Sequence, residues 1–336
     1  MIIKDVITPY DKQRVVGFLA EQGLKFEQNA DKTIYIEDAD KIVGTVSAAR
    51  YIIKCLAVSS YLRGENLAVT LVGEMIKRLH ADGIYYYQVF TKSEYKDVFE
   101  SLGFKTLVKT EKTVMLEGGD GNINDVLNGI KVQMRFNLNI PDVGNPAHDV
   151  ACIVLNGDPF TLGHLALAEY ALKNHKYLVV FVLEEEGSYF SANERYTLAY
   201  LALRQFPNAL VVKSTRYIVS QSTFPQYFLK TADEATGQYA EFDAKIFAEY
   251  FMPALGLTKR YIGSETTDYM SIYNATLKSV LGDKVEEVPR FSENGMIISA
   301  KTVRALLKEG DINGATQLVP IATRALFANM AKQKQN

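Results

Sequence analysis

Residues 156–164, N-G-D-P-F-T-L-G-H, follow directly on the apolar run 151–155 and precede a helical pattern. A strand that turns into a helix leaves the first N–H groups of that helix unpaired, and the helix dipole attracts an anion to them. Gly163 lets a nucleotide approach the backbone, and His164 can donate a hydrogen bond to a phosphate as charge develops. The alternative is a tight strand–helix turn that Thr161 merely caps. We expect nucleotide contacts from Asn156, Asp158, Pro159, Phe160, Thr161, Gly163 and His164.

A second group of candidate residues opens a C-terminal helix after the predicted strand 285–288. Ser299 can cap this helix, which leaves N–H groups for an anion, and Lys301 and Arg304 can neutralise β- and γ-phosphates. The alternative is a capped helix with an exposed basic face. We expect Ile298, Ser299, Lys301 and Arg304 at the nucleotide.

Two further candidates follow other predicted strands. Gly263, Ser264 and Glu265 come after the strand 260–262, where N–H groups and a carboxylate can hold an adenine or a ribose. Glu265 can instead cap the next helix. Arg195 lies in the first turn of a predicted helix and can reach a phosphate or a carboxylate, although a single helix arginine is more often solvated.

Alternating strands and helices in the second half of the chain must position these groups. Strands are predicted at 152–155, 177–183, 210–213, 260–262 and 285–288, and helices at 165–173, 193–204, 271–281 and 302–307, with a helical insertion at 224–251. This alternation is typical of an α/β fold with a doubly wound parallel sheet. Ligands of such sheets bind at the carboxyl ends of the strands, where the 156–164 turn lies.

The first half of the chain has shorter, mixed elements. Helices are predicted at 11–22, 65–79 and 94–102, and strands at 33–36, 42–49, 51–58, 84–90, 104–108 and 113–116. A G-G-D-G break at 118–121, a helix at 126–136 and a proline-containing stretch at 141–149 separate the halves. We therefore predict a mixed α/β domain at 1–117, a linker with a bridging helix at 118–147, and a nucleotide-binding domain at 148–336.

The composition limits the possible partners. The 336 residues carry a net charge of −2, which argues against a nucleic-acid binder and against a binder of anionic membranes. Cys55 and Cys152 lie in apolar runs and are expected to be buried free thiols, and no Cys–His metal cluster is visible. No run approaches the ~18 apolar residues of a membrane span, and the start lacks signal-peptide character, so we expect a cytoplasmic protein.

The motifs resemble those of two known folds. Residues 156–164 and 298–304 resemble the (H/T)-x-G-H and I-S-x-S-x-x-R motifs of the nucleotidyltransferase superfamily, with Thr161 in place of the first histidine. Residues 61–68 resemble the pyrophosphate loop R-x-x-G-x-G/A of GNAT-like acetyltransferases, with Asn66 in place of a glycine, and residues 99–104 resemble the L-G-F helix end of that fold. The resemblance implies a GNAT-like domain followed by a Rossmann-like nucleotidyltransferase domain.

This combination is similar, over essentially the whole chain, to the citrate lyase ligase family. That family's usual strings, N-x-N-P-F-T-x-G-H and I-S-A-S-x-V-R, differ here at Asp158 and Lys301. The resemblance implies that acetate attacks the α-phosphorus of ATP to give acetyl-adenylate and pyrophosphate. A thiol on the CoA-like prosthetic group of the citrate lyase acyl carrier subunit then takes the acetyl group and releases AMP.

The resemblance also implies roles for single residues. His164 and Thr161 would bind the phosphates at the bond that breaks, and Ser299, Lys301 and Arg304 would hold the β/γ end. The phosphates and water would carry most of the Mg²⁺ coordination. The GNAT-like domain would receive the CoA-like arm of the partner.

Three other functions remain open at this point. An adenylyltransferase that makes a dinucleotide-type cofactor would explain the motifs of the second domain but not the first domain. A GNAT-type N-acetyltransferase with a regulatory nucleotide-binding domain is disfavoured by Asn66. A nucleotide-sensing interaction protein would bind ATP and release no pyrophosphate.

Overall fold

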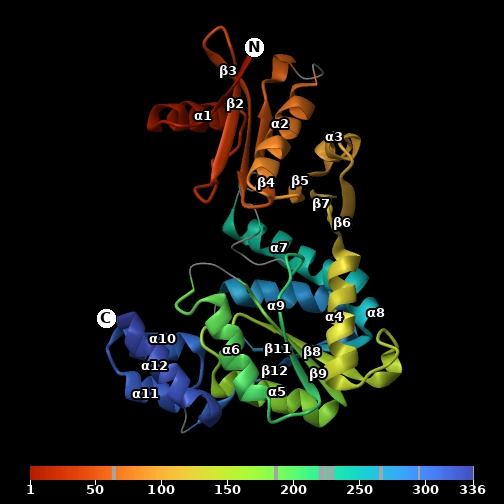
Figure 1. The fold of residues 1–336 in the computed structure, drawn as a ribbon, viewed down its shortest axis with the longest axis vertical. Helices are drawn as coiled ribbons and strands as arrows, with labels where there is room; N and C mark the ends of the chain where they lie inside the picture. Colours follow the sequence, from red (N-terminus) through yellow and green to blue (C-terminus); the bar gives the residue numbers. More distant parts are fainter. Residues whose placement is uncertain are drawn as a thin grey trace. The chain divides into compact units, whose positions relative to one another are not determined.

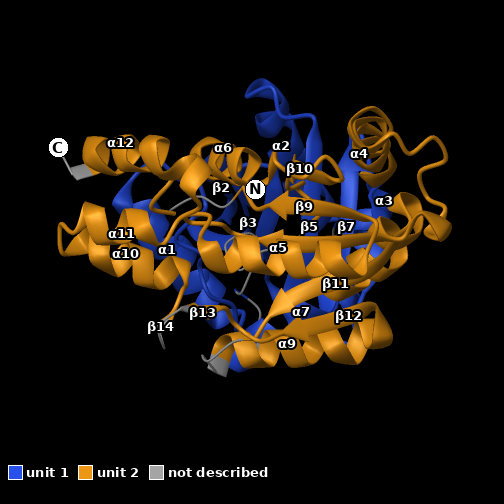
Figure 2. Ribbon diagram, turned by 90° about the horizontal axis from the view of Figure 1, so that it is seen from below, with its two compact units in different colours: residues 1–122, 223–242 blue, residues 123–222, 243–336 orange. Residues whose placement is uncertain are grey.

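The computed structural model describes residues 1–62, 66–184, 188–218, 224, 227, 231–264, 268–293 and 296–335 (Figure 1). The chain forms two compact units, one of residues 1–122 with 223–242 and the other of residues 123–222 with 243–336 (Figure 2). The domain boundaries drawn from the sequence, after residues 117 and 147, stay a prediction.

The first unit is built on one sheet with the strand order β1-β2-β3-β4-β5-β7-β6. Its strands are β1 (Ile2–Asp5), β2 (Lys32–Asp38), β3 (Lys41–Ala49), β4 (Ile52–Val58), β5 (Tyr86–Lys92), β6 (Lys105–Lys109) and β7 (Thr113–Gly119), and its helices are α1 (Pro9–Glu21), α2 (Leu67–Ala81) and α3 (Lys96–Ser101). The sequence pattern misses β1 because only Ile3 in this edge strand is partly buried, so no apolar alternation marks it.

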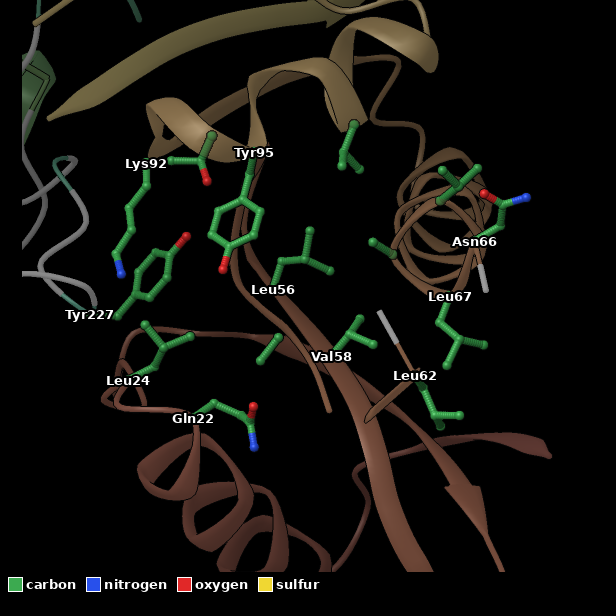
Figure 3. Close-up of a pocket in the computed structure, with 15 residues that line it drawn as sticks. Gln22, Leu24, Leu56, Val58, Leu62, Asn66, Leu67, Lys92, Tyr95 and Tyr227 are labelled. Carbon is green, nitrogen blue, oxygen red and sulfur yellow. The ribbon is translucent and has the colours of Figure 1, made fainter. Parts of the chain in front are cut away.

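The central strands β4 and β5 leave a cavity between them. They are the parallel neighbours in this otherwise antiparallel sheet, and they pair only at Ile52 with Gln88 and at Ile53 with Val89. Beyond this pairing lies a cavity of about 310 Å³ with mostly apolar walls. Figure 3 shows Leu56, Tyr95 and Tyr227 around it. The first unit therefore has room for a slender ligand between two strands.

Tyr227 comes from far along the chain, yet it completes this unit. Its hydroxyl donates to the carbonyl of Phe90 at 3.3 Å, and its backbone N–H donates to Oε1 of Glu27 at 3.0 Å. Later in the same segment, Gln238 accepts hydrogen bonds from the hydroxyls of Thr110 and Thr113. Part of the helical insertion predicted at 224–251 thus belongs to the first unit.

The second unit is built on a fully parallel five-stranded sheet with the order β10-β9-β8-β11-β12. Its strands are β8 (Val150–Leu155), β9 (Tyr177–Val182), β10 (Ala209–Lys213), β11 (Leu257–Gly263) and β12 (Val285–Val288), with the short hairpin β13 (Ser292–Glu293) and β14 (Met296–Ile297). Its helices are α4 (Ile123–Leu138), α5 (Leu162–Asn174), α6 (Ala192–Leu203), the later part of α7 (Ala232–Ile246), the π-helical turn Phe247–Phe251, α8 (Met252–Leu255), α9 (Asp268–Leu281), α10 (Ala300–Lys308), α11 (Ile312–Gln317) and α12 (Arg324–Gln335). The predicted α/β class with a doubly wound parallel sheet is confirmed.

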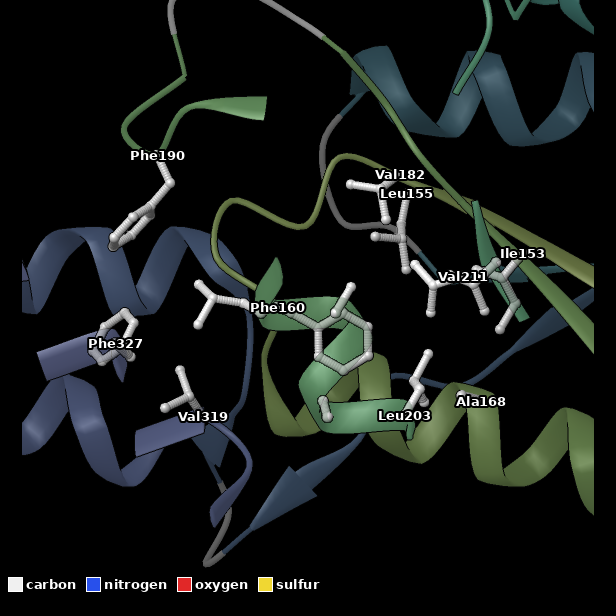
Figure 4. Packing of buried hydrophobic residues seen from close by; sticks show 14 of the residues in the cluster. Ile153, Leu155, Phe160, Ala168, Val182, Phe190, Leu203, Val211, Val319 and Phe327 are labelled. Atoms are coloured by element: carbon white, nitrogen blue, oxygen red, sulfur yellow. The ribbon is translucent and has the colours of Figure 1, made fainter. Parts of the chain in front are cut away.

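Nearly every residue of β8 and β9 is buried, as expected of parallel strands that are covered on both faces. On one face, these strands pack with α5, α6 and the C-terminal helices in a single apolar cluster (Figure 4). Phe160 contributes its ring to this cluster, and the rings of Phe190 and Phe327 lie 5.6 Å apart in it. The core therefore anchors the start of α5 directly to the sheet.

The strand order creates a crevice at the carboxyl ends of β8 and β11. The chain leaves β8 toward β9 and β10, whereas β11 and β12 lie on its other side. At such a switch point the loops after neighbouring strands diverge and leave space for a ligand. The loops that carry residues 156–161 and 264 follow these two strand ends.

Two expectations from composition are tested by the structure. Cys55 and Cys152 are buried free thiols, as predicted, and burial raises the pKa of each to about 12. Neither is therefore a ready nucleophile at neutral pH. No helix within the described residues is long and apolar enough to cross a membrane.

Candidate active site

His164 lies in the first turn of α5, directly after the loop that leaves β8. Thr161 is the N-cap residue of this helix, and its backbone N–H donates to Nδ1 of His164 at 3.0 Å. The hydroxyl of Thr161 also lies 3.0 Å from Nδ1. Because Nδ1 accepts a hydrogen bond from an amide, the proton of a neutral imidazole must sit on Nε2. The loop therefore presents His164 as an Nε2–H donor.

The electrostatic surroundings of His164 keep it neutral. Burial of the imidazole, followed by the positive charges of Arg290 and Arg304, lowers its pKa from 6.5 to about 4. The residue is nevertheless partly exposed to solvent. At neutral pH His164 can thus donate a hydrogen bond to an anion without carrying charge of its own.

Gly163 brings the two predicted motifs into contact. A Cβ built on Gly163 would lie 2.6 Å from the carbonyl oxygen of Ile298. The sequence suggested that this glycine makes room for a nucleotide, but the space beside it is filled by the backbone of the second motif. Gly163 is therefore needed for the packing of residues 298–304 against the start of α5.

The second motif opens α10 as predicted. Ser299 is the N-cap residue, and its hydroxyl accepts from the backbone N–H of Thr302 at 3.1 Å. Arg304, one turn later, donates to the backbone carbonyl of Asp158. Since the backbone of Ile298 also lies against Gly163, the N-termini of α5 and α10 meet at the same place, which brings two helix dipoles together there. Lys301 is exposed.

Asp158 and Arg195 hold the loops around the site. The carboxylate of Asp158 is 4% exposed and accepts the backbone N–H groups of Tyr189 at 2.9 Å and Phe190 at 2.7 Å. Its Oδ2 also lies 3.5 Å from Nη1 of Arg304. These bonds connect the loop after β8 to the loop after β9. Contact of Asp158 with a nucleotide stays a prediction.

Arg195 is fully buried, although a solvated or ligand-facing side chain was expected. Its guanidinium donates to the carbonyls of Phe190 at 3.1 Å, Asn156 at 2.8 Å and Leu183 at 2.7 Å, and also to the side chain of Asn156. Four acceptors from the loops after β8 and β9 satisfy a charge that would be costly to bury alone. Arg195 thus fixes the position of Asn156 at the end of β8.

The third predicted motif lies at the end of β11. Asn274 on α9 donates to the carbonyl of Gly263 at 3.0 Å, and the backbone N–H of Ser264 donates to the carbonyl of Val288 at 2.8 Å. Glu265 lies outside the described residues. These bonds tie the loops after β11 and β12 together beside the crevice.

Sequence reasoning missed Arg290. Its Nε donates to the backbone carbonyl of Ser264 at 2.6 Å, and its charge is the larger of the two arginine contributions that depress the pKa of His164. Arg290 follows β12 by two residues, so a basic residue just beyond a predicted strand was the signal that could have identified it. It adds a second arginine to the site.

The remaining predicted residues are structural neighbours of the site. Pro159 is buried, and Phe160 and Ile298 are 1% and 4% exposed. The Phe160 ring lies 5.3 Å from the imidazole of His164. These side chains hold the backbone of both motifs in place rather than offering polar atoms. Among the described residues, no group of three His, Cys, Asp or Glu side chains could hold a metal ion.

The arrangement suits an anion with several negative charges. Two helix N-termini, one neutral imidazole donor and two arginines surround the carboxyl ends of β8 and β11. Such groups stabilise a polyphosphate and the charge that builds up when one of its bonds breaks.

Comparisons with known proteins identify both halves of the chain. Residues 150–327 match the family model of the citrate lyase ligase C-terminal domain, and residues 6–115 match that of the acetyltransferase (GNAT) domain. The chain is 30% identical to the [citrate [pro-3S]-lyase] ligase of Escherichia coli, over 96% of this chain and 91% of that protein. It is 28% identical to the ligase of the same name from Klebsiella pneumoniae, over 99% and 98%.

Among solved structures, the aminoglycoside 6'-N-acetyltransferase from Enterococcus faecium superposes on 35% of this chain and 97% of its own, with a TM-score of 0.32 and 15% identity. The match to the ligase C-terminal model covers more than half of this chain, and the full-length similarity extends through the GNAT domain. The chain therefore belongs to the citrate lyase ligase family.

Proposed function

We propose that this protein is an ATP-dependent ligase that activates acetate and transfers the acetyl group to a thiol of the citrate lyase acyl carrier subunit. Its membership of the citrate lyase ligase family supports the reaction class. The observation that carries the proposal for the site is the meeting of the α5 and α10 N-termini around a neutral His164.

The first step forms acetyl-adenylate. A carboxylate oxygen of acetate attacks the α-phosphorus of ATP, the bond from this phosphorus to the bridging oxygen breaks, and pyrophosphate leaves with both electrons. Acetate is already ionised, so no base is required. Nε2–H of His164 donates to the phosphate oxygens that gain charge, and the α10 N-terminus with Arg304 and Lys301 neutralises the leaving pyrophosphate.

Magnesium would accompany the nucleotide in this proposal. The carboxylate of Asp158, in the first motif, already accepts hydrogen bonds from two backbone N–H groups and lies beside Arg304 of the second motif. It is thus poorly suited to serve as a metal ligand. We propose that phosphate oxygens and water provide most of the Mg²⁺ ligands, and that Mg²⁺ neutralises part of the triphosphate charge.

The second step transfers the acetyl group to the thiol. The thiolate attacks the carbonyl carbon of acetyl-adenylate, a thioester forms, and AMP leaves. We propose that the cavity between β4 and β5 receives part of the CoA-like arm that carries this thiol. Its mostly apolar walls and its position between two diverging strands support this role, because a slender chain with amide groups can use strand-edge hydrogen bonds.

The reaction can be tested by measuring pyrophosphate and AMP release from Mg-ATP and acetate, with and without the deacetylated acyl carrier subunit. AMP release that needs both acetate and the carrier thiol is the expected result. Pyrophosphate release that depends on a nucleotide acceptor would instead identify an adenylyltransferase. Acetyl-CoA consumption without ATP would identify an N-acetyltransferase, and ATP binding without any release would identify a nucleotide sensor.

The role of the cavity needs a separate variant. Ala68→Trp adds a large ring to the cavity wall from α2. We expect it to raise the KM for the acyl carrier subunit about tenfold or more while acetate-dependent exchange of pyrophosphate into ATP stays unchanged. An unchanged KM in a folded variant would remove the cavity from the reaction. Ala81→Trp, at the far end of the same helix, serves as the control.

A further inference from the structure

Arg290 is held firmly at the edge of the crevice. Its Nε donates to the carbonyl of Ser264 at 2.6 Å, and its backbone N–H donates to the hydroxyl of Ser264 at 3.0 Å. The N–H of Ser264 in turn donates to the carbonyl of Val288 at 2.8 Å. Three hydrogen bonds thus join the loop after β12 to the end of β11, so the guanidinium is positioned before any substrate arrives.

Arg290 and Arg304 are held by different loops at the carboxyl ends of the sheet strands. Arg304 is bonded to the carbonyl of Asp158 in the loop after β8, whereas Arg290 is bonded to Ser264 after β11. Both charges act on the same imidazole. The site therefore holds two cations against the loops after β8 and β11: Arg304, which comes from α10, and Arg290, which comes from the loop after β12.

Formation of an acyl-adenylate calls for two cations, one at the attacking carboxylate and one at the leaving pyrophosphate. The carboxylate and the triphosphate are both anions and repel each other, and the attacking and leaving oxygens lie roughly in line at the α-phosphorus. A cation for the leaving pyrophosphate does not serve the attacking carboxylate at the other end. The planar guanidinium fork of an arginine matches a carboxylate well.

We propose that Arg290 binds the carboxylate of the acyl substrate and orients it for attack on the α-phosphorus. Arg304 and α10 then serve the pyrophosphate end. This inference rests on the proposed function, and it adds that Ser264 acts as a positioning residue through its bonds to Arg290. It makes Arg290 a catalytic residue that determines affinity for the carboxylate substrate rather than for ATP.

The test uses the full chain with Arg290→Gln and Arg290→Lys, and measures acetate-dependent exchange of pyrophosphate into ATP. We expect Arg290→Gln to raise the KM for acetate about tenfold or more, the effect of losing a charge-assisted bond, while the Kd for ATP stays within about twofold. Arg290→Lys keeps the charge and should recover part of the loss. Arg204→Gln is the matched control, because Arg204 is an exposed arginine at the C-terminal end of α6.

A second readout does not depend on activity. Removal of the Arg290 charge should raise the pKa of His164 toward 6.5, which can be followed by NMR in the unliganded variant, whereas Arg204→Gln should leave this pKa unchanged.

Two kinetic results would overturn the inference. A weaker Kd for ATP with an unchanged KM for acetate would assign Arg290 to the phosphates, and no change in either constant would exclude it from substrate binding. If the wild-type protein shows no acetate-dependent exchange, the proposed function fails first. In that case an unchanged pKa of His164 in Arg290→Gln would also exclude Arg290 from the site.

Discussion

Replacing Gly163 with alanine should separate the packing of the site from its chemistry. The new Cβ would lie 2.6 Å from the carbonyl oxygen of Ile298, whereas ordinary contact begins at 3.4 Å. The backbone of Ile298 must therefore retreat by 0.8 Å, and it has little freedom because Ile298 is 4% exposed and directly precedes the N-cap of α10. The added methyl group would therefore disturb the contact between the start of α5 and residues 298–304.

The size of the effect follows from this overlap. Overpacking a well-filled site by one carbon costs about 1–3 kcal/mol. For a domain of roughly 200 residues this lowers the melting temperature by about 2–12 °C. Because α10 carries Ser299 and Arg304, the same displacement should weaken ATP binding. Gly163→Ala is thus expected to lose stability and ATP affinity together.

Thermal unfolding followed by circular dichroism and calorimetric titration with Mg-ATP measure the two quantities. Gly129→Ala on α4 is the matched control, since a Cβ there meets no atom within 4 Å. That control should unfold at the same temperature or slightly higher, because alanine favours a helix by up to about 1 kcal/mol over glycine. A weaker ATP affinity of Gly163→Ala with an unchanged melting temperature would refute the packing argument and favour direct approach of the nucleotide.

Other substitutions test the remaining groups of the site. His164→Ala should lower pyrophosphate-forming turnover by ~10²-fold, the effect of losing one transition-state donor, and a loss below threefold would remove His164 from the mechanism. Because the pKa of His164 is about 4 in the folded protein and about 6.5 when unfolded, the unfolded state binds this proton first on acidification. The free energy of unfolding, measured with urea, should therefore fall as the pH drops from about 6.5 to 4. In His164→Gln it should depend less on pH over this range. Arg304→Ala should mainly weaken ATP binding in titration calorimetry, and an unchanged Kd would contradict its place at the phosphates. Asp158→Asn loses an acceptor for one of the backbone N–H groups of Tyr189 and Phe190 and should reduce the free energy of unfolding by about 1–3 kcal/mol, which an unchanged urea midpoint would disprove.

Local sequence patterns predicted the fold of the second unit and the motifs of its site. Buried β-runs separated by helical patterns define a parallel sheet because each crossover must cover a face of it. Ser299 is predictable as an N-cap because a hydroxyl followed by a helical pattern satisfies the first N–H groups. These features depend on residues that are close together along the chain.

Features that depend on distant residues were not predictable in the same way. Arg195 has the pattern of a surface helix arginine, and only the fold brings the carbonyls of Asn156 and Leu183 to it. The constraint on Gly163 likewise comes from Ile298, far along the chain. Arg290 belongs to no motif, since its role depends on Ser264 in the loop after β11 and on His164 in the first turn of α5, both far from it along the chain.

The late entry of residues 223–242 into the first unit has a consequence for synthesis on the ribosome. This segment supplies Tyr227 and the rings of Phe224 and Phe242, which lie 5.5 and 5.8 Å from the ring of Phe90. Residues 123–222 must be translated before it, which takes about 5–20 s at roughly 5–20 residues per second. Until then the nascent first unit lacks these aromatic partners, so we expect it to recruit chaperones that shield apolar surface. A protein truncated after residue 122 would never acquire these aromatic partners, so its apolar surface would stay exposed.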